Sequence, residues 1–428
     1  MDADTLPDPT DARAVRRTIH AFPELGFCEI RTANLAWRTL ESLGWVLTGG
    51  TSLVDVDGYA GLPGESELET ACAEARAQGV DHQSIDRFGG GATAFIAELS
   101  GNRPGPTVAL RVDMDALPVA ESRHPDHRPA AEGFASRNAG RMHACGHDGH
   151  VAIGLRVAAG LSADRDFPGR VRLILQPAEE GVRGAAPMVA AGVCDDVDTM
   201  LALHLGFGAS LGSVAPATDL YATTKLRAEF IGKASHASNA PEEGRNALLA
   251  AASAILSLHG LPPFASTPTR VNVGTLLSEG APNIIPARAI LHAEVRAGIA
   301  AVHEELERRA LAVLSGAAAM QGVEVRTSQT GRATTATNDR VVLAVIEEVS
   351  ETVDLIVGAP QPLRASDDAT LMMNRVQDLG GHAAYILIGS GDFGAHHSPT
   401  FDIDESALEH GAHLIEAVVR AGCPEGVA

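Results

Sequence analysis

The nine residues Met142-His143-Ala144-Cys145-Gly146-His147-Asp148-Gly149-His150 bring together one thiol, one carboxylate and three imidazoles, with two glycines that allow tight turns. Sulfur and imidazole nitrogen are the donors that bind zinc, manganese and similar divalent ions in proteins. A histidine-rich run is as often a solvated loop, so this stretch alone leaves both interpretations open. Ligands supplied by the rest of the chain decide between them.

Three short apolar runs surround this stretch, and each leads into residues that can bind metal or move protons. The runs are 107–112, 171–175 and 199–203. Asp113 follows the first run, Glu179-Glu180 comes shortly after the second, and His204 follows the third. A helical pattern at 151–161 lies between the first two, and strands alternating with helices predict an α/β fold with a mostly parallel sheet. Open α/β sheets place their ligands past the carboxyl ends of the strands, so these residues should meet at one edge.

The pattern changes near residue 218. Segments 222–230 and 270–277 alternate as half-buried strands do, and an alanine-rich helix at 246–258 lies between them. We therefore predict a separate α+β domain with its helices on one face of an antiparallel sheet. The expected domains are a catalytic domain formed by 1–218 and 333–428, and an inserted domain formed by 219–332.

Length and composition exclude several classes of protein. At 428 residues the chain exceeds one usual hydrophobic core, and 45% hydrophobic with 20% charged residues is typical of soluble globular proteins. The formal net charge of −21 argues against nucleic acid and anionic membranes as partners. The five scattered cysteines suggest no disulfide framework, and we recognise no signal peptide or membrane-spanning run, so we expect a cytoplasmic protein.

Glu179 and Glu180 follow a predicted strand, where adjacent carboxylates beside divalent ions can divide the work. One carboxylate coordinates the metal, and the other takes a proton from a metal-bound water whose pKa the metal has lowered. The second carboxylate then returns that proton to the departing amine. Two metals about 3.5–4 Å apart would hold the hydroxide between them. Without a metal, a solvated surface pair is the alternative.

Five stretches of the chain resemble the amidohydrolase branch of the M20 metallopeptidase family. They are His20-Ala21-Phe22-Pro23-Glu24-Leu25, Arg111-Val112-Asp113-Met114-Asp115-Ala116-Leu117-Pro118, the run around Cys145, Gln176-Pro177-Ala178-Glu179-Glu180-Gly181 and His397-Ser398-Pro399. This branch includes aminobenzoyl-glutamate hydrolase A subunits and indole-acetyl-amino-acid hydrolases. An apparent insertion at 46–92 and the run 368–373 are most similar to the first of these groups. The resemblance implies a zinc-peptidase-type catalytic domain with an inserted lid and dimerisation domain.

The resemblance also implies two divalent metal ions, manganese or zinc, and a role for each matching residue. The implied metal ligands are Cys145, His147, Glu180, His204 and His397. Glu179 would be the general base and acid. Asp113 matches a carboxylate that lies behind a metal-binding histidine elsewhere in the family. Because Arg111, two residues earlier, cannot be a ligand, we expect Asp113 to support catalysis from behind the ligands. His396 competes with His397, and the family pattern favours the histidine directly before Ser-Pro.

Three residues of the predicted lid domain match functional positions of the family. His236 matches a histidine that enters the partner subunit's site and steadies the developing oxyanion. Asn283 and Arg296 match positions that bind a substrate carboxylate, for which a planar guanidinium is well suited. The resemblance therefore implies a homodimer or higher homo-oligomer; the alternative partner is a paralogous second subunit. Without the resemblance, these residues would be a loop histidine, a turn asparagine and a surface arginine.

Four functions compete. The leading hypothesis is hydrolysis of an amide C–N bond in a small, carboxylate-bearing, aromatic substrate. The first alternative keeps the metals but expels ammonia from an electron-poor aryl amine, as in nitroanthranilate aminohydrolases. A hydrolase with Cys145 as nucleophile, activated by His147 or His150, predicts activity that survives chelation. A non-catalytic binding protein would lack a functional base, and the presence of Glu179 counts against it.

Overall fold

The structure is a computed structural model that describes residues 6–391, 393–424 and 426. These residues form two compact units. The larger unit contains the described chain up to Thr218, Ala336–Leu363 and the residues from Asp368 onward. The smaller unit contains Asp219–Thr335 and Arg364–Asp367. Within the described ranges, no helix has both the length and the apolar character needed to cross a membrane.

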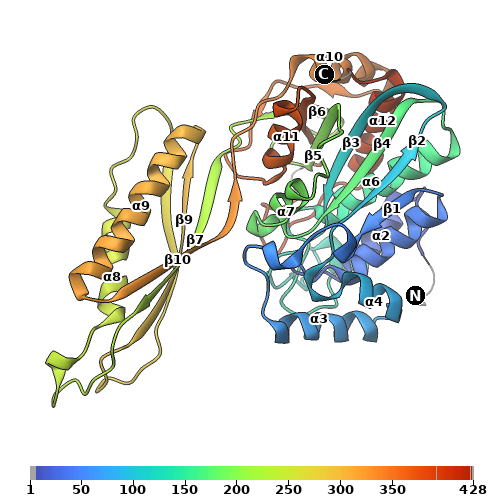
Figure 1. Cartoon of the computed structure of the whole chain (residues 1–428). Helices are drawn as coiled ribbons and strands as arrows, with labels where there is room; N and C mark the ends of the chain where they lie inside the picture. The colour runs from blue at the N-terminus through green and yellow to red at the C-terminus, as the bar shows by residue number, and fades with distance from the viewer. Residues whose placement is uncertain (1–5, 392, 425, 427–428) are drawn as a thin grey trace. The chain divides into compact units, whose positions relative to one another are not determined.

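The larger unit is built on one mixed sheet, whose strands run in the order β1-β2-β4-β3-β5-β13-β6-β11, with β12 also paired to β6 (Figure 1). The strands are β1 (Val46–Gly49), β2 (Phe95–Ser100), β3 (Arg103–Asp113), β4 (Pro168–Gln176), β5 (Thr199–Leu205), β6 (Ser213–Thr218), β11 (Ile356–Val357), β12 (Gln361–Pro362) and β13 (His382–Ile388). The four central strands β4, β3, β5 and β13 are parallel, while β2 and β6 join them antiparallel. The predicted α/β fold with a mostly parallel sheet is confirmed.

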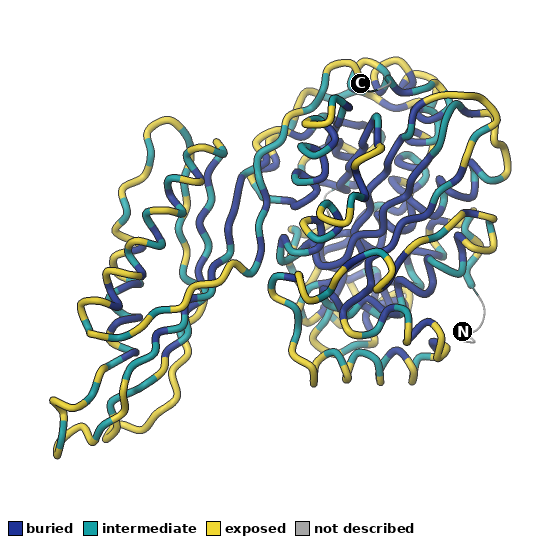
Figure 2. Tube along the Cα trace, in the orientation of Figure 1, coloured by how far each residue is buried: buried dark blue, intermediate teal, exposed yellow. Residues whose placement is uncertain are grey.

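Helices pack on both faces of this sheet. They are α1 (Ala12–His20), α2 (Ile30–Ser42), α3 (Glu65–Ala77), α4 (His82–Phe88), α5 (Arg128–Ala131), α6 (His147–Ala163), α7 (Ala185–Ala190), α10 (Arg340–Ser350), α11 (Ala369–Asp378) and α12 (Ser406–Ala421). α6 packs against β3, α1 and α12, whereas α7 and α11 pack together and α11 contacts β13 and β5. α6 is apolar on most sides and almost fully buried, as expected for a helix in the centre of a layer. Figure 2 shows the buried strands between these helices.

The smaller unit is an antiparallel sheet with the order β10-β7-β9-β8, covered on one face by two helices (Figure 1). Its elements are β7 (Ala222–Ile231), α8 (Ala247–His259), β8 (Thr269–Leu277), β9 (Arg288–Ala297), α9 (Ala300–Gln321) and β10 (Glu324–Ala333). Side chains of β9 alternate between buried and half-buried positions, and Leu291 and Val295 pack into a core with α8 and α9. The predicted α+β arrangement of this region is confirmed.

The region 46–92 begins with a strand of the main sheet. Its first strand, β1, pairs antiparallel with β2 and forms the edge of the main sheet. α3 and α4 then follow before the chain enters β2. The region 46–92 is thus anchored to the larger unit by β1 at its start and by β2, which follows its end.

Candidate metal centre

The parallel pairing of β4, β3 and β5 brings their carboxyl ends to the same edge of the sheet. Asp113 is the last residue of β3 and pairs with Gln176, the last residue of β4. His204 is the penultimate residue of β5. The sheet therefore delivers these side chains to one place, as the strand pattern predicted.

The cysteine and histidine run lies beside this edge, and its last residues form the first turn of a helix. Gly146 has a left-handed backbone with φ of 95°, and α6 begins immediately after it, at His147. The sequence pattern had indicated a helix only from residue 151. The first turn is polar in sequence but buried, with His147, Asp148 and His150 all enclosed, so the apolar periodicity starts one turn too late. His147 and His150 thereby stand one turn apart on the same helix.

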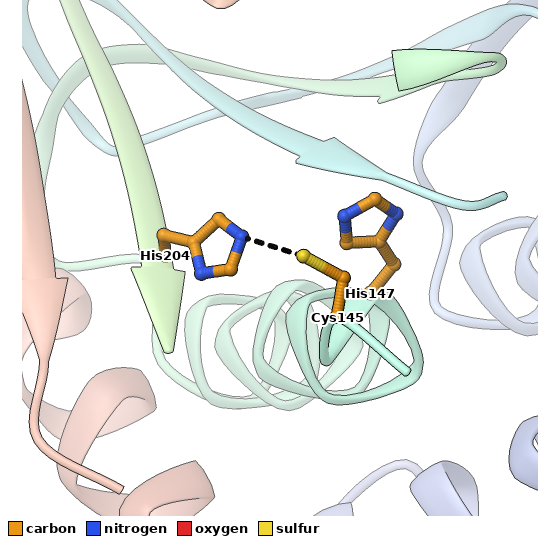
Figure 3. Close-up of side chains that lie close together, drawn as sticks. All are labelled: Cys145, His147 and His204. Carbon is orange, nitrogen blue, oxygen red and sulfur yellow. Dashed lines mark hydrogen bonds between the residues drawn. The ribbon is translucent and has the colours of Figure 1, made fainter. Parts of the chain in front are cut away.

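Three donors meet in the first group (Figure 3). The ligand atoms of Cys145, His147 and His204 all lie within 4.8 Å of one another, and Cys145 Sγ is 3.4 Å from His204 Nε2. Backbone carbonyl groups fix both imidazoles: His147 Nδ1 is 2.8 Å from Asp115 O, and His204 Nδ1 is 2.9 Å from Leu205 O. These contacts place the proton on Nδ1 and turn each Nε2 towards the sulfur as a possible metal donor.

Cys145 also belongs to a second group, with Glu180 and His397, whose ligand atoms lie within 4.8 Å of one another. His397 Nε2 is 3.6 Å from Glu180 Oε1. The backbone of His397 is left-handed, with φ of 65°, and its N–H donates to Ala144 O at 2.7 Å. The rival His396 turns away to Leu205 O at 3.2 Å and stacks on Phe207.

The five predicted ligands therefore form two overlapping groups that share Cys145, and they come from four separate parts of the chain. A further group joins His147 to Glu179 and Glu180. Glu179 Oε2 lies 3.9 Å from His147 Nε2. The predicted base is thus beside the predicted ligands.

The position of the two glutamates depends on a strained corner after β4. Ala178 has a left-handed backbone with φ of 53°, which is uncommon for a residue with a Cβ atom. The carboxylate of Asp115 accepts hydrogen bonds from the N–H groups of Glu179 at 2.9 Å and Glu180 at 3.0 Å. Sequence reasoning gave Asp115 no role. The available signal was its place two residues after Asp113, just beyond the end of β3.

Asp113 lies in a buried polar network and itself forms a candidate group with His147 and His150. Its carboxylate accepts from Arg111 Nη1 at 2.6 Å and contacts His150 Nδ1 at 2.6 Å, while His147 Nε2 is 3.8 Å away. His150 Nε2 in turn accepts the N–H of Leu205 at 3.0 Å, which ties α6 to the end of β5. Arg111 also donates to Gln176 Oε1 at 2.8 Å. The guanidinium therefore supplies countercharge to Asp113 and takes no part in the donor groups.

Burial and neighbouring charges shift the pKa values of the donors in opposite directions. Burial and the nearby Glu180 carboxylate raise the pKa of the Cys145 thiol well above its usual range. Burial and the nearby His150 lower the pKa of His204 well below its usual value. Burial also opposes protonation of His147, but the Asp113 carboxylate and the contacts with Asp115 and Cys145 together outweigh it and raise the pKa of His147 well above its usual value. In the described part of the chain, His147 Nε2 is nonetheless buried without a hydrogen-bond partner.

The donor set and its spacing fit a divalent metal ion. A tetrahedral zinc ion with Zn–S of about 2.3 Å and Zn–N of about 2.0 Å separates sulfur from nitrogen by about 3.5 Å. The distance of 3.4 Å between Cys145 Sγ and His204 Nε2 agrees with that separation. A cation at His147 Nε2 would also satisfy its buried nitrogen. Because a metal ligand must be deprotonated, the cation would replace the proton that the surroundings of His147 otherwise favour.

In the smaller unit, His236 and Asn283 lie on adjacent loops. His236 forms an isolated bridge with Ile284, and the N–H of Ala237 donates to Asn283 O at 3.0 Å. Arg296 lies near the other end of β9, roughly 26 Å from Arg288 at the first end by strand geometry. Its guanidinium is paired with Glu294 at 2.9 Å. Within a single protomer, the smaller unit therefore does not bring Arg296 together with His236 and Asn283.

Comparison with known proteins places these observations in one family. Residues 109–421 match the model of peptidase family M20/M25/M40. The chain is 45% identical to indole-3-acetyl-aspartic acid hydrolase of Enterobacter agglomerans over 413 residues, covering 94% of this chain and 93% of that protein. It is 44% identical to the A subunit of p-aminobenzoyl-glutamate hydrolase from Escherichia coli strain K12, covering 95% and 93%. The crystal structure of an aminobenzoyl-glutamate utilization protein from Klebsiella pneumoniae superposes with a TM-score of 0.80 at 36% identity, covering 96% and 95%.

Proposed function

The chain belongs to peptidase family M20/M25/M40, and we propose that it is a dinuclear metal hydrolase that cleaves an amide C–N bond in a small, carboxylate-bearing, aromatic substrate. The two relatives named above are hydrolases of an aromatic acyl group joined to aspartate or glutamate. This chain resembles both over nearly its whole length. An acyl-aspartate or acyl-glutamate of this kind is therefore the proposed substrate class.

The convergence of Cys145, His147, Glu180, His204 and His397 carries the proposal. These residues would hold two divalent ions, manganese or zinc, because the set mixes sulfur, nitrogen and oxygen donors. When bound, the two ions would activate water and polarise the scissile carbonyl group. Burial raises the pKa of Cys145, which disfavours a free thiolate and argues against Cys145 as the nucleophile.

Glu179 is the proposed general base and acid. Its backbone N–H is held by Asp115, and its carboxylate oxygen lies 3.9 Å from His147 Nε2, at the border of the donor groups. From there it can accept a proton from the attacking water and deliver that proton to the leaving amine. Asp113 supports this arrangement by fixing His150 and balancing the charge of Arg111.

The smaller unit would supply the groups that bind the rest of the substrate. His236 Nδ1 accepts hydrogen bonds from the N–H groups of Ser238 and Asn239, both at 3.2 Å, so the proton of the neutral ring is on Nε2. That exposed N–H can donate to the oxyanion that develops on the scissile carbonyl. Asn283 and Arg296 are proposed to bind substrate carboxylates. Their separation from each other along the sheet supports sites shared between two protomers.

Product analysis tests this proposal. The protein loaded with manganese or zinc should release glutamate from p-aminobenzoyl-glutamate or aspartate from indole-3-acetyl-aspartate, and chelation should abolish the activity. Glu179→Gln should keep both metals by elemental analysis but lose turnover by about 10²–10⁴-fold. Ammonia release from a nitroanthranilate, without amide cleavage, would instead establish the aryl-amine reaction. Full activity after chelation would exclude a metal mechanism.

A further inference from the structure

A cavity in the larger unit is lined by part of the region 46–92 and by two arginines that are close in sequence to candidate metal ligands. Its volume is about 480 Å³. The inserted region contributes the loop before α3 and the first turns of that helix, while Arg141 and Arg183 come from the loops that carry Cys145 and Glu180. Its size falls within the range of small-molecule sites, about 300–1,000 Å³.

Arg183 is the charge that distinguishes this cavity. Its Nη1 donates to Gly61 O at 2.6 Å, and its guanidinium lies 5.0 Å from the Phe27 ring. Its Nε is buried without a hydrogen-bond partner, and among the described residues no carboxylate forms an ion pair with it. The enclosed Nε cannot meet a ligand, but a guanidinium without a carboxylate partner favours an anion that accepts from its terminal nitrogens.

Gly26 makes room for this guanidinium. A Cβ atom at Gly26 would lie 2.6 Å from Arg183 Nη2, closer than side chains tolerate. The absence of a side chain at Gly26 therefore leaves room for the Arg183 guanidinium in the wall of the cavity.

The other charged groups of the lining already have partners. Arg141 Nη1 pairs with Glu74 at 2.6 Å. Glu67 is turned to the N–H of Gly64 at 3.0 Å, where it caps the start of α3. Neither group neutralises Arg183. Arg183 is therefore the lining arginine that has no carboxylate partner among the described residues, while Glu67 contributes a negative charge to the same lining.

Apolar side chains complete the lining. Leu25, Leu62, Pro63 and Ala71 contribute to it. We propose that this cavity binds a small organic anion, with a carboxylate on Arg183 and an apolar or aromatic body against Leu25 and Leu62. The inference rests on the cavity itself and does not require the metal chemistry proposed above.

The position of the cavity gives two sources for such an anion. Arg183 follows Glu180 by three residues, so their Cα atoms are at most about 11 Å apart. Arg141 precedes Cys145 by four residues. An occupant would thus touch both loops that carry candidate ligands. It is either the carboxylate of the substrate or product, or a separate anion that acts on those loops.

Binding of benzoate to the metal-loaded protein tests the proposal, with neutral benzamide as the matched probe. We expect benzoate to bind more tightly than benzamide, and Arg183→Met to weaken benzoate binding by about tenfold or more. Arg76→Met is the control, because Arg76 is exposed on α3 and does not line the cavity. Glu180→Gln removes a proposed metal ligand that does not line the cavity, so it should retain benzoate binding. If benzoate bound at the metal centre instead, this variant would lose that binding.

Thr70→Trp, which narrows the cavity from the exposed side of α3, provides a second variant if Arg183→Met does not fold. It too should weaken benzoate binding. Unchanged affinity in a folded Arg183→Met protein, or in Thr70→Trp where that protein is needed, overturns the proposal. The proposal is also overturned if Glu180→Gln loses benzoate binding while Arg183→Met retains it, because benzoate would then occupy the metal centre.

Steady-state kinetics of Arg183→Met on p-aminobenzoyl-glutamate identify the source of the anion once benzoate binding is established. A raised KM with unchanged kcat means that the cavity holds the carboxylate of the substrate. Unchanged kinetics in the absence of benzoate mean that it holds a separate anion. If the protein does not cleave this amide at all, the benzoate measurements still decide whether the cavity is a site.

Discussion

The carboxylate of Glu29 accepts a hydrogen bond at 2.9 Å from the backbone N–H of Ala178, the residue directly before Glu179. The other carboxylate oxygen accepts from Thr93 Oγ1 at 2.7 Å. Together with Asp115, Glu29 binds three successive N–H groups of the strained corner. The position of the proposed base is therefore set by two buried carboxylates from distant parts of the chain.

Replacing Glu29 should impair turnover more than metal binding. Glu29→Ala leaves the buried N–H of Ala178 without an acceptor, which costs about 1–3 kcal/mol and allows the corner to relax. We expect kcat to fall by about tenfold or more, with metal content near that of the wild type. Glu29→Gln keeps an amide oxygen for the same bond and should retain most of the activity. Wild-type kcat in a folded Glu29→Ala protein would show that the corner holds its shape without this contact.

Removing the shared sulfur should empty the metal centre. Cys145→Ala deletes a donor common to both ligand groups, so elemental analysis should find markedly less bound metal than in the wild type. Cys194→Ala is the matched control, because Cys194 is also a buried free thiol but belongs to none of the candidate groups. Full metal content in Cys145→Ala would refute the ligand assignment.

Mixing two inactive proteins tests whether sites are shared between protomers. If His236 acts in the site of a partner, His236→Ala and Glu179→Gln protomers can combine to form one intact site. Random exchange within dimers should then recover about a quarter of wild-type activity. Each variant exchanged with itself serves as the control. Absence of recovery, with mixed dimers detected by mass, would mean that each protomer completes its own site.

The buried His20 makes stability depend on pH. His20 Nδ1 is 2.7 Å from Asp148 and Nε2 is 3.0 Å from Glu121. Burial opposes protonation, but Asp148 and Glu121 outweigh it and raise the pKa of His20 from 6.5 to about 9. The proton thus stabilises the folded state fully below about pH 6.5, and this contribution disappears as the pH rises through about 9.

Urea unfolding at several pH values measures this contribution. His20→Gln should be less stable than the wild type at pH 6, and the difference should shrink by up to about 3 kcal/mol by pH 9.5. His124→Gln, which changes an exposed histidine, is the control. A difference that stays constant between pH 6 and 9.5 would show that His20 carries no additional proton in the folded protein.

The sequence predicted the central strands and the inserted α+β region because their apolar patterns are long and regular. Among the strands that were not predicted, two have identifiable reasons. β6 contains Pro216 and is short, which weakens any strand pattern. β10 is an edge strand with mostly polar, exposed residues, so its pairing with β7 leaves little apolar signal.

The donor groups were predicted from a family resemblance carried by several short motifs, whereas their supports were not predicted. Cys145, Glu180 and His397 are residues whose chemistry is visible in the sequence. Glu29 and Asp115 act through hydrogen bonds to backbone N–H groups 149 and 64 or 65 residues away. Such contacts depend on the folded path of the chain, and only Asp115 left a local signal, its place just beyond the end of β3. The cavity beside Arg183 was missed for the same reason, since its lining is assembled from separate segments.

Because Cys145 belongs to both candidate ligand groups, the two proposed metal positions would not be chemically independent. Oxidation of Cys145 to a sulfinate would remove the thiolate donor from both positions in one irreversible event. Inactivation by peroxide would then weaken both positions of a protomer together. Burial and bound metals would both protect the Cys145 thiol from peroxide. The metal-depleted protein should therefore be oxidised faster than the metal-loaded protein.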